Sequence, residues 1–90
     1  MAVRLGGRLK ELRIHLCQVG KQSEGVRNFV KDLYPQLKES NPKFPILIRE
    51  CSGIKPKLWA RYEKGQETCV KLDDCNAADV MKKIEQIAKN

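Results

Sequence analysis

The sequence has no long apolar run, no CxxC pair and only one histidine. The missing apolar run excludes a membrane-spanning helix, which needs about 20 consecutive apolar residues. Thioredoxin-type turnover needs a second thiol three residues after the first, whereas Gln18, Val19 and Gly20 follow Cys17. His15 belongs to no catalytic constellation, the glycines match no phosphate loop, and the cysteine spacings match no standard zinc pattern. We therefore expect no cofactor, no metal and no catalytic site.

What is present is a short, basic, globular sequence. Ninety residues, 41% hydrophobic and 32% charged, are typical of one folded domain. The net charge of +7 favours an acidic partner, which includes nucleic acid, an anionic lipid surface or an acidic protein. Residues 1–10 hold no acid and are interpreted as a basic tail, either solvated or acting as a short uncleaved mitochondrial address. Residues 11–90 are predicted to form the single domain.

The first half of the chain has the pattern of a strand, a helix and a second strand. Strict alternation predicts a strand over Glu11–Cys17, and Ser23 is a suitable N-cap for a helix whose apolar spacing continues to Leu37. Pro35 is expected to kink this helix, or to break it and start a final short turn. Pro45–Cys51 is the second strand, parallel to the first through a right-handed crossover.

The second half has the pattern of a hairpin followed by a helix. Lys57–Glu63 and Gln66–Leu72 are predicted as antiparallel strands around a Lys64-Gly65 turn. Asn76 is a suitable N-cap for the last helix, with Asp79 completing a variant of the capping box. The order β-α-β-β-β-α predicts a thioredoxin-like α/β fold, with a mixed four-stranded sheet in the order 2-1-3-4 and both helices on one face. Residues 52–56 are too few for another helix, so the second sheet face is expected to be bare.

Alternation along the strands sorts their side chains onto two faces. The face expected to lie under the helices is apolar: Leu12, Ile14, Leu16, Ile46, Ile48, Leu58, Ala60, Val70 and Leu72. The opposite face is cationic and carries one large aromatic and three thiols: Arg13, His15, Cys17, Leu47, Arg49, Cys51, Trp59, Arg61, Cys69 and Lys71. It is either a docking face for an acidic partner, with Trp59 as its anchor, or a solvated face whose arginines keep the protein soluble.

Cys17 and Cys51 end neighbouring parallel strands with the same parity. Adjacent strands lie about 4.8 Å apart, which is within the span of a disulfide. A bridge is therefore sterically allowed, and two reduced, half-buried thiols are an equally open alternative. The state of the peptide bond before Pro56, where thioredoxins carry a cis-proline, is left open by the sequence.

Four segments together resemble one family: Glu11–Gln18, Pro45–Ser52, Pro56–Tyr62 and Gly65–Thr68. They are similar to the thioredoxin-like accessory subunits of mitochondrial NADH:ubiquinone oxidoreductase, respiratory complex I, and the resemblance extends from about residue 9 to the C-terminus. It implies a subunit without catalytic residues, flavin or iron–sulfur ligands. That subunit would lie peripherally on the matrix side of the mitochondrial inner membrane, bind other matrix-arm subunits, and support assembly and stability of the NADH-oxidising module.

The resemblance also implies that Cys17 and Cys51 match a cysteine pair able to form a disulfide, while Pro35, Cys69 and Cys75 lie outside the pattern. The main alternative is a mitochondrial ribosomal protein of the same superfamily that contacts rRNA. A basic sheet face would suit contact with rRNA. A free thiol oxidoreductase acting through Cys17 alone is a second alternative.

Overall fold

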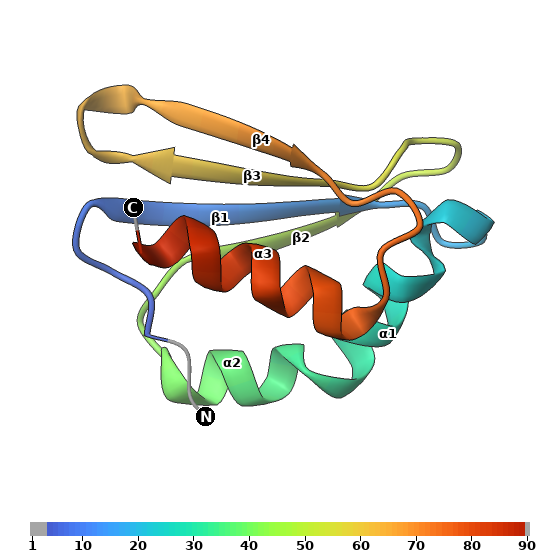
Figure 1. Cartoon of the computed structure of the whole chain (residues 1–90), viewed down its shortest axis with the longest axis horizontal. Coiled ribbons are helices and arrows are strands. Elements are labelled where there is room, and N and C mark those ends of the chain that lie inside the picture. The colour runs from blue at the N-terminus through green and yellow to red at the C-terminus, as the bar shows by residue number, and fades with distance from the viewer. Residues whose placement is uncertain (1–3, 90) are drawn as a thin grey trace.

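The computed structural model describes residues 4–89 (Figure 1). Met1–Val3, in the predicted tail, and Asn90, at the end of the predicted domain, lie outside the described residues. The elements in chain order are β1 (Leu9–Leu16), α1 (Glu24–Asp32), α2 (Tyr34–Ser40), β2 (Ile46–Glu50), β3 (Lys57–Tyr62), β4 (Glu67–Lys71) and α3 (Ala77–Lys89). Two single 3-10 turns, η1 (Lys21–Ser23) and η2 (Glu63–Gly65), precede α1 and β4.

The four strands form one mixed sheet in the order β2-β1-β3-β4. β1 pairs in parallel with β2 and antiparallel with β3, and β3 pairs antiparallel with β4. This order and pairing agree with the predicted sheet. Figure 1 shows the helices on one side of the sheet, as expected, but residues 4–89 contain three α-helices where two were predicted.

The additional helix arises from a break before Pro35. α1 ends at Asp32, and α2 begins at Tyr34 with the proline in its first turn. Proline has no N–H to donate, and this absence is harmless in the first turn of a helix. The backbone stays connected across Leu33, whose N–H bonds to Phe29 O at 2.8 Å. Of the two expected outcomes, the break is therefore the one observed.

The sheet begins earlier than the alternation predicted. β1 starts at Leu9, which is 1% exposed, so the boundary predicted between residues 10 and 11 lies inside this strand. The N–H of Leu5 donates to Asn41 Oδ1 at 2.8 Å, which joins part of the predicted tail to the end of α2. The β1–β3 register shifts between Leu9 and Glu11. This irregularity precedes Leu12, and the face assignment of the following residues is unaffected.

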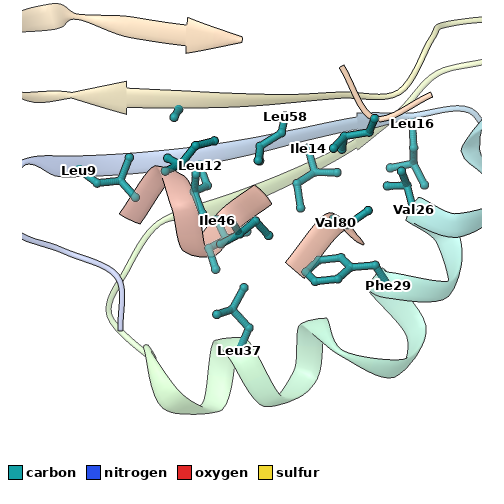
Figure 2. Packing of buried hydrophobic residues seen from close by; sticks show 14 residues of the cluster. Leu9, Leu12, Ile14, Leu16, Val26, Phe29, Leu37, Ile46, Leu58 and Val80 are labelled. Atoms are coloured by element: carbon teal, nitrogen blue, oxygen red, sulfur yellow. The ribbon is translucent and has the colours of Figure 1, made fainter. Parts of the chain in front are cut away.

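The core fills the space between the sheet and the helices (Figure 2). Phe29 from α1 and Ile84 from α3 are fully buried against strand residues. Of the nine side chains predicted for the covered sheet face, seven are buried: Leu12, Ile14, Leu16, Ile46, Leu58, Ala60 and Leu72. Ile48 and Val70 are half-buried and pack against the cluster. The predicted apolar face is thus the sheet's contribution to the core.

Some features of the loops and helix ends were predicted from the sequence, and others were not. Asn76 caps α3 as expected, since its Oδ1 accepts the N–H of Asp79 at 2.8 Å. In the hairpin, Lys64 and Gly65 both have positive φ, 63° and 73°, which glycine adopts readily and lysine rarely. Every described peptide bond is trans, including the one before Pro56. No helix within residues 4–89 is long and apolar enough to cross a membrane.

Candidate functional site: the outer sheet face and the Cys17 loop

The sheet face turned away from the helices carries the predicted docking residues. The β1–β3 register sets Arg13 beside Trp59 and His15 beside Lys57, and the β1–β2 register sets His15 beside Arg49. Three of the six predicted docking residues are half-buried (Arg13, His15 and Trp59), and three are exposed (Arg49, Arg61 and Lys71). All six lie on strands, where alternation turns them to the same face.

The three half-buried docking residues line an open groove of about 500 Å³ on this face. The full lining is Arg13, His15, Ile54, Lys55, Lys57, Trp59 and Glu67. Arg49, Arg61 and Lys71 do not line it. Lys57 and Glu67 were not among the predicted docking residues, although alternation along β3 and β4 assigns both to this face. Ile54 and Lys55 come from the loop before β3, where no periodicity indicates which way a side chain points.

Trp59 and His15 form the aromatic part of the groove. Their ring centroids are 6.5 Å apart and the ring planes are tilted by 47°, within the range of favourable aromatic pairs. Burial lowers the pKa of His15, and the nearby charges of Arg49, Arg13 and Lys57 lower it further. His15 is therefore neutral at pH 7, and the positive charge of the face comes from lysine and arginine side chains.

Part of that charge is neutralised by Glu11. Its carboxylate contacts Arg13 at 3.2 Å and Arg61 at 3.7 Å. Within residues 4–89 neither Lys57 nor Arg49 has an ion pair. The groove thus combines the unpaired cation of Lys57 with apolar surface from Trp59 and Ile54, and this combination suits an acidic partner that also presents an apolar side chain.

Cys17, which parity assigns to the outer face, is not open to solvent. It is 5% exposed and directly follows the last residue of β1, Leu16. Its Sγ accepts the N–H groups of Gly20 and Gly53, each at 3.3 Å. Backbone N–H donation from Val19, then Gly53 and Gly20, lowers the pKa of the Cys17 thiol. The sulfur therefore joins the loop after β1 to the loop after β2.

Two side chains of the following helical segment hold this loop. Ser23 is the N-cap residue of α1, as predicted, but its side chain makes no capping hydrogen bond, and its Oγ accepts the N–H of Cys17 at 3.0 Å. Arg27 donates through Nη1 to Cys17 O at 2.9 Å and to Gly20 O at 2.7 Å. The alternation of β1 could not indicate these contacts, because they depend on the packing of α1 beside the end of the strand.

The cysteines are free thiols in the structure. The N–H of Cys51 bonds to Leu16 O at 3.0 Å, so Cys17 and Cys51 follow directly on the last register pair of β1 and β2. Cys51 and Cys69 are exposed, and Cys75 is half-buried. Residues 4–89 contain no group of three histidine, cysteine or acidic side chains placed to hold a metal ion.

Comparison with known proteins gives one family match. The model of the mitochondrial ribosomal protein L51/S25/CI-B8 domain matches residues 26–77. This segment runs from α1 through β4 to the first residue of α3 and contains the groove residues of β3 and β4.

Relatives that match over most of their length come from a plant, an animal and a fungus. A protein named NADH dehydrogenase (ubiquinone) 1 alpha subcomplex subunit 2 from Arabidopsis thaliana is 50% identical, over 91% of this chain and 84% of its own. The mouse protein of the same name is 48% identical, over 88% and 80%. The NADH-ubiquinone oxidoreductase 10.5 kDa subunit of Neurospora crassa is 39% identical, over 91% and 87%.

Proposed function

The chain belongs to the mitochondrial ribosomal protein L51/S25/CI-B8 domain family and, within it, to the alpha subcomplex subunit 2 proteins of NADH dehydrogenase, and from this premise we propose that it is a non-catalytic accessory subunit of the complex I matrix arm. In this proposal it has a thioredoxin-like fold and lies peripherally on the matrix side of the mitochondrial inner membrane. Its partners are other complex I subunits, and it supports assembly and stability of the NADH dehydrogenase module.

The observation that carries this proposal is the identity of 39–50% with complex I subunits over most of each chain. These relatives support a mitochondrial complex I subunit as the general role. The matrix-arm position and the assembly role are the finer part of the proposal. The missing resolving thiol after Cys17 supports the absence of thioredoxin-type catalysis.

The outer sheet face is the surface proposed to bind the neighbouring subunit. Its groove offers Trp59 as an apolar anchor, flanked by His15 and the unpaired cation of Lys57. Half-buried aromatic residues of this kind are frequent hot spots of protein interfaces. Arg49, Arg61 and Lys71 are placed at the rim of this surface, where charges mainly affect the association rate and its salt dependence.

The test is incorporation into complex I in cells that lack the endogenous subunit. On a native gel, the wild-type chain should migrate with NADH dehydrogenase activity. Lys57→Glu reverses a charge in the groove and should reduce incorporation, whereas Lys31→Glu makes the same change at an exposed site on α1 and should not. Equal incorporation of both variants would refute the docking face, and migration of the wild type away from the complex would refute the proposed role.

We also propose that Cys17 and Cys51 are the pair that can form a disulfide. Their adjacent positions after β1 and β2 support it, as does the contact of Gly53 N–H with Cys17 Sγ. On treatment with diamide, the two thiols lose two protons and two electrons to its N=N bond and form one S–S bond. Peptide mapping should then recover a linked peptide containing both residues. A map in which Cys51 is linked only to Cys69 or Cys75 would contradict the pairing.

The second candidate function is an rRNA-contacting ribosomal protein, which the family description and the basic sheet face both favour. Sedimentation of a mitochondrial lysate separates the two roles. Migration with the ribosomal subunits, abolished by ribonuclease, would support the ribosomal role and reject complex I.

A further inference from the structure

β4 is an edge strand with neither a proline nor a bulge to interrupt pairing along it. It ends the sheet on the side opposite β2, and Figure 1 shows it outermost, beyond β3. Its five residues contain no proline, and its register with β3 has no bulge. Only Val70 is half-buried, and the other four residues are exposed. Edges of this kind are available to pair with another strand.

The hydrogen bonds of the hairpin identify which backbone groups point outward. Leu72 N–H bonds to Pro56 O at 3.0 Å, and Tyr62 N–H bonds to Gln66 O at 2.7 Å. Because paired and unpaired residues alternate in an antiparallel ladder, the even-numbered residues of β4 bond to β3. The N–H and C=O groups of the odd-numbered residues therefore face away from the sheet: Glu67, Cys69 and Lys71.

These outward groups remain available within the described chain. Residues 4–89 provide a partner to one of them only, Lys71 O, which accepts Lys83 Nζ at 2.8 Å. A carbonyl oxygen has two lone pairs, so this oxygen can accept a second hydrogen bond. The edge can therefore accommodate a strand along its whole length.

The sequence of β4, Glu-Thr-Cys-Val-Lys, is complementary to itself in the antiparallel direction. If two copies pair with Cys69 opposite Cys69, Glu67 of each copy lies opposite Lys71 of the other. Both end pairs then join opposite charges, which stabilise cross-strand pairs. This register also uses the full length of the strand and matches the outward groups of one copy with those of the other.

We propose that two copies of the free chain associate through β4, forming a continuous eight-stranded sheet with a two-fold axis at Cys69. The interface is isologous, so each contact occurs twice. It does not depend on the proposed role in complex I, because the pairing is made by the outward backbone groups of β4, although the side chain of Glu67 also lines the groove. Since the edge is short, the dimer is of the weak, reversible kind and forms in a concentration-dependent way.

Charge reversal tests the register. In sedimentation equilibrium of the purified full chain, the wild type should show a monomer–dimer equilibrium. Lys71→Glu sets like charges opposite each other at both ends and should weaken the dimer by about tenfold. The double variant Glu67→Lys/Lys71→Glu restores opposite charges and should recover the dimer. Lys31→Glu, the same change at an exposed position on α1, should leave it unchanged.

Thiol crosslinking tests the contact at the axis. Opposed residues in a hydrogen-bonded antiparallel pair have Cα atoms about 5.5 Å apart, within the range a disulfide allows. Diamide should link two copies through Cys69, as its N=N bond takes up two protons and two electrons from the two thiols and one S–S bond forms. Cys69→Ser should abolish the covalent dimer, and Cys51→Ser, at another exposed cysteine, should not.

Three results would overturn the proposal. The first is a wild-type chain that stays monomeric at every concentration and forms no Cys69 crosslink. The second is a double variant, folded by circular dichroism, that does not recover the dimer lost in Lys71→Glu. The third is a Cys69 crosslink found only to another subunit in the assembled complex, which would assign the edge to a partner strand. A Lys57→Glu variant that dimerises but fails to enter complex I would leave the dimer supported and locate the defect in docking.

Discussion

The hydroxyl of Ser23 accepts the backbone N–H of Cys17 at 3.0 Å, in a position where Ser23 is 1% exposed. This contact joins the end of β1 to the start of α1. With Arg27, which binds the carbonyls of Cys17 and Gly20, it fixes the loop that places the Cys17 thiol. The loop is therefore held by side chains of the helix that follows it.

Ser23→Ala should destabilise the fold by about 1–3 kcal/mol, because it leaves the buried N–H of Cys17 without an acceptor. Urea unfolding monitored by circular dichroism measures the change. Ser40→Ala, at an exposed position at the end of α2, is the matched control and should have a small effect. Equal stability of the Ser23→Ala variant and the wild type would show that the hydrogen bond contributes nothing net.

Gly25→Ala should destabilise the fold by about 3 kcal/mol or more, since the new methyl group has no room. A Cβ at this position would lie 1.6 Å from Cys75 O, a backbone atom next to the start of α3. Gly20→Ala is the control, because its Cβ would meet only Cys17 side-chain atoms at 3.4 Å. Thermal unfolding should show a large loss for the first variant only. A normal melting temperature for Gly25→Ala would contradict the close approach of α1 and this loop.

The stability contributed by Cys17 should increase with pH. Donation from the N–H groups of Val19, Gly53 and Gly20 lowers the pKa of its thiol in the folded chain. Between the folded and unfolded pKa values the unfolded chain binds more protons, so this contribution rises with pH and is lost as pH falls through the folded value. Urea unfolding under reducing conditions should show that the stability of the wild type relative to Cys17→Ser increases as the pH rises toward the ordinary pKa of a thiol. A difference independent of pH would reject the prediction.

The imidazole of His15 should titrate below 6.5, because burial and the charges of Arg49, Arg13 and Lys57 disfavour its protonated form. NMR titration of the ring protons measures the midpoint directly, and His15 is the only histidine in the chain. Arg49→Ala should raise the midpoint, since Arg49 has the largest of the charge effects. Lys31→Ala, on the exposed side of α1, should not. A midpoint unaffected by Arg49→Ala would reject the effect assigned to the Arg49 charge.

Much of the sheet and the last helix could be predicted from local patterns. Period-two alternation identified Leu12 and Ile14 as core residues, and Asn76 was recognisable as a cap from its position before Asp79. The docking residues Arg13 and Trp59 were found on one face for the same reason. The loop residues of the groove, Ile54 and Lys55, were not, since alternation ends with the strand.

The sequence by itself determined the strands, their faces and the family. It also limited the helix at Pro35 to two outcomes, a kink or a break. These depend on interactions between near neighbours in the chain, or on residue patterns read directly. Tertiary structure alone decided that the Cys17 thiol is enclosed by two loops and that the hydroxyl of Ser23, the N-cap residue of α1, accepts the N–H of Cys17. It also placed α1 at Gly25 against the Cys75 carbonyl. Each of these contacts joins segments whose approach depends on how helices and sheet pack together, and no local pattern records that packing.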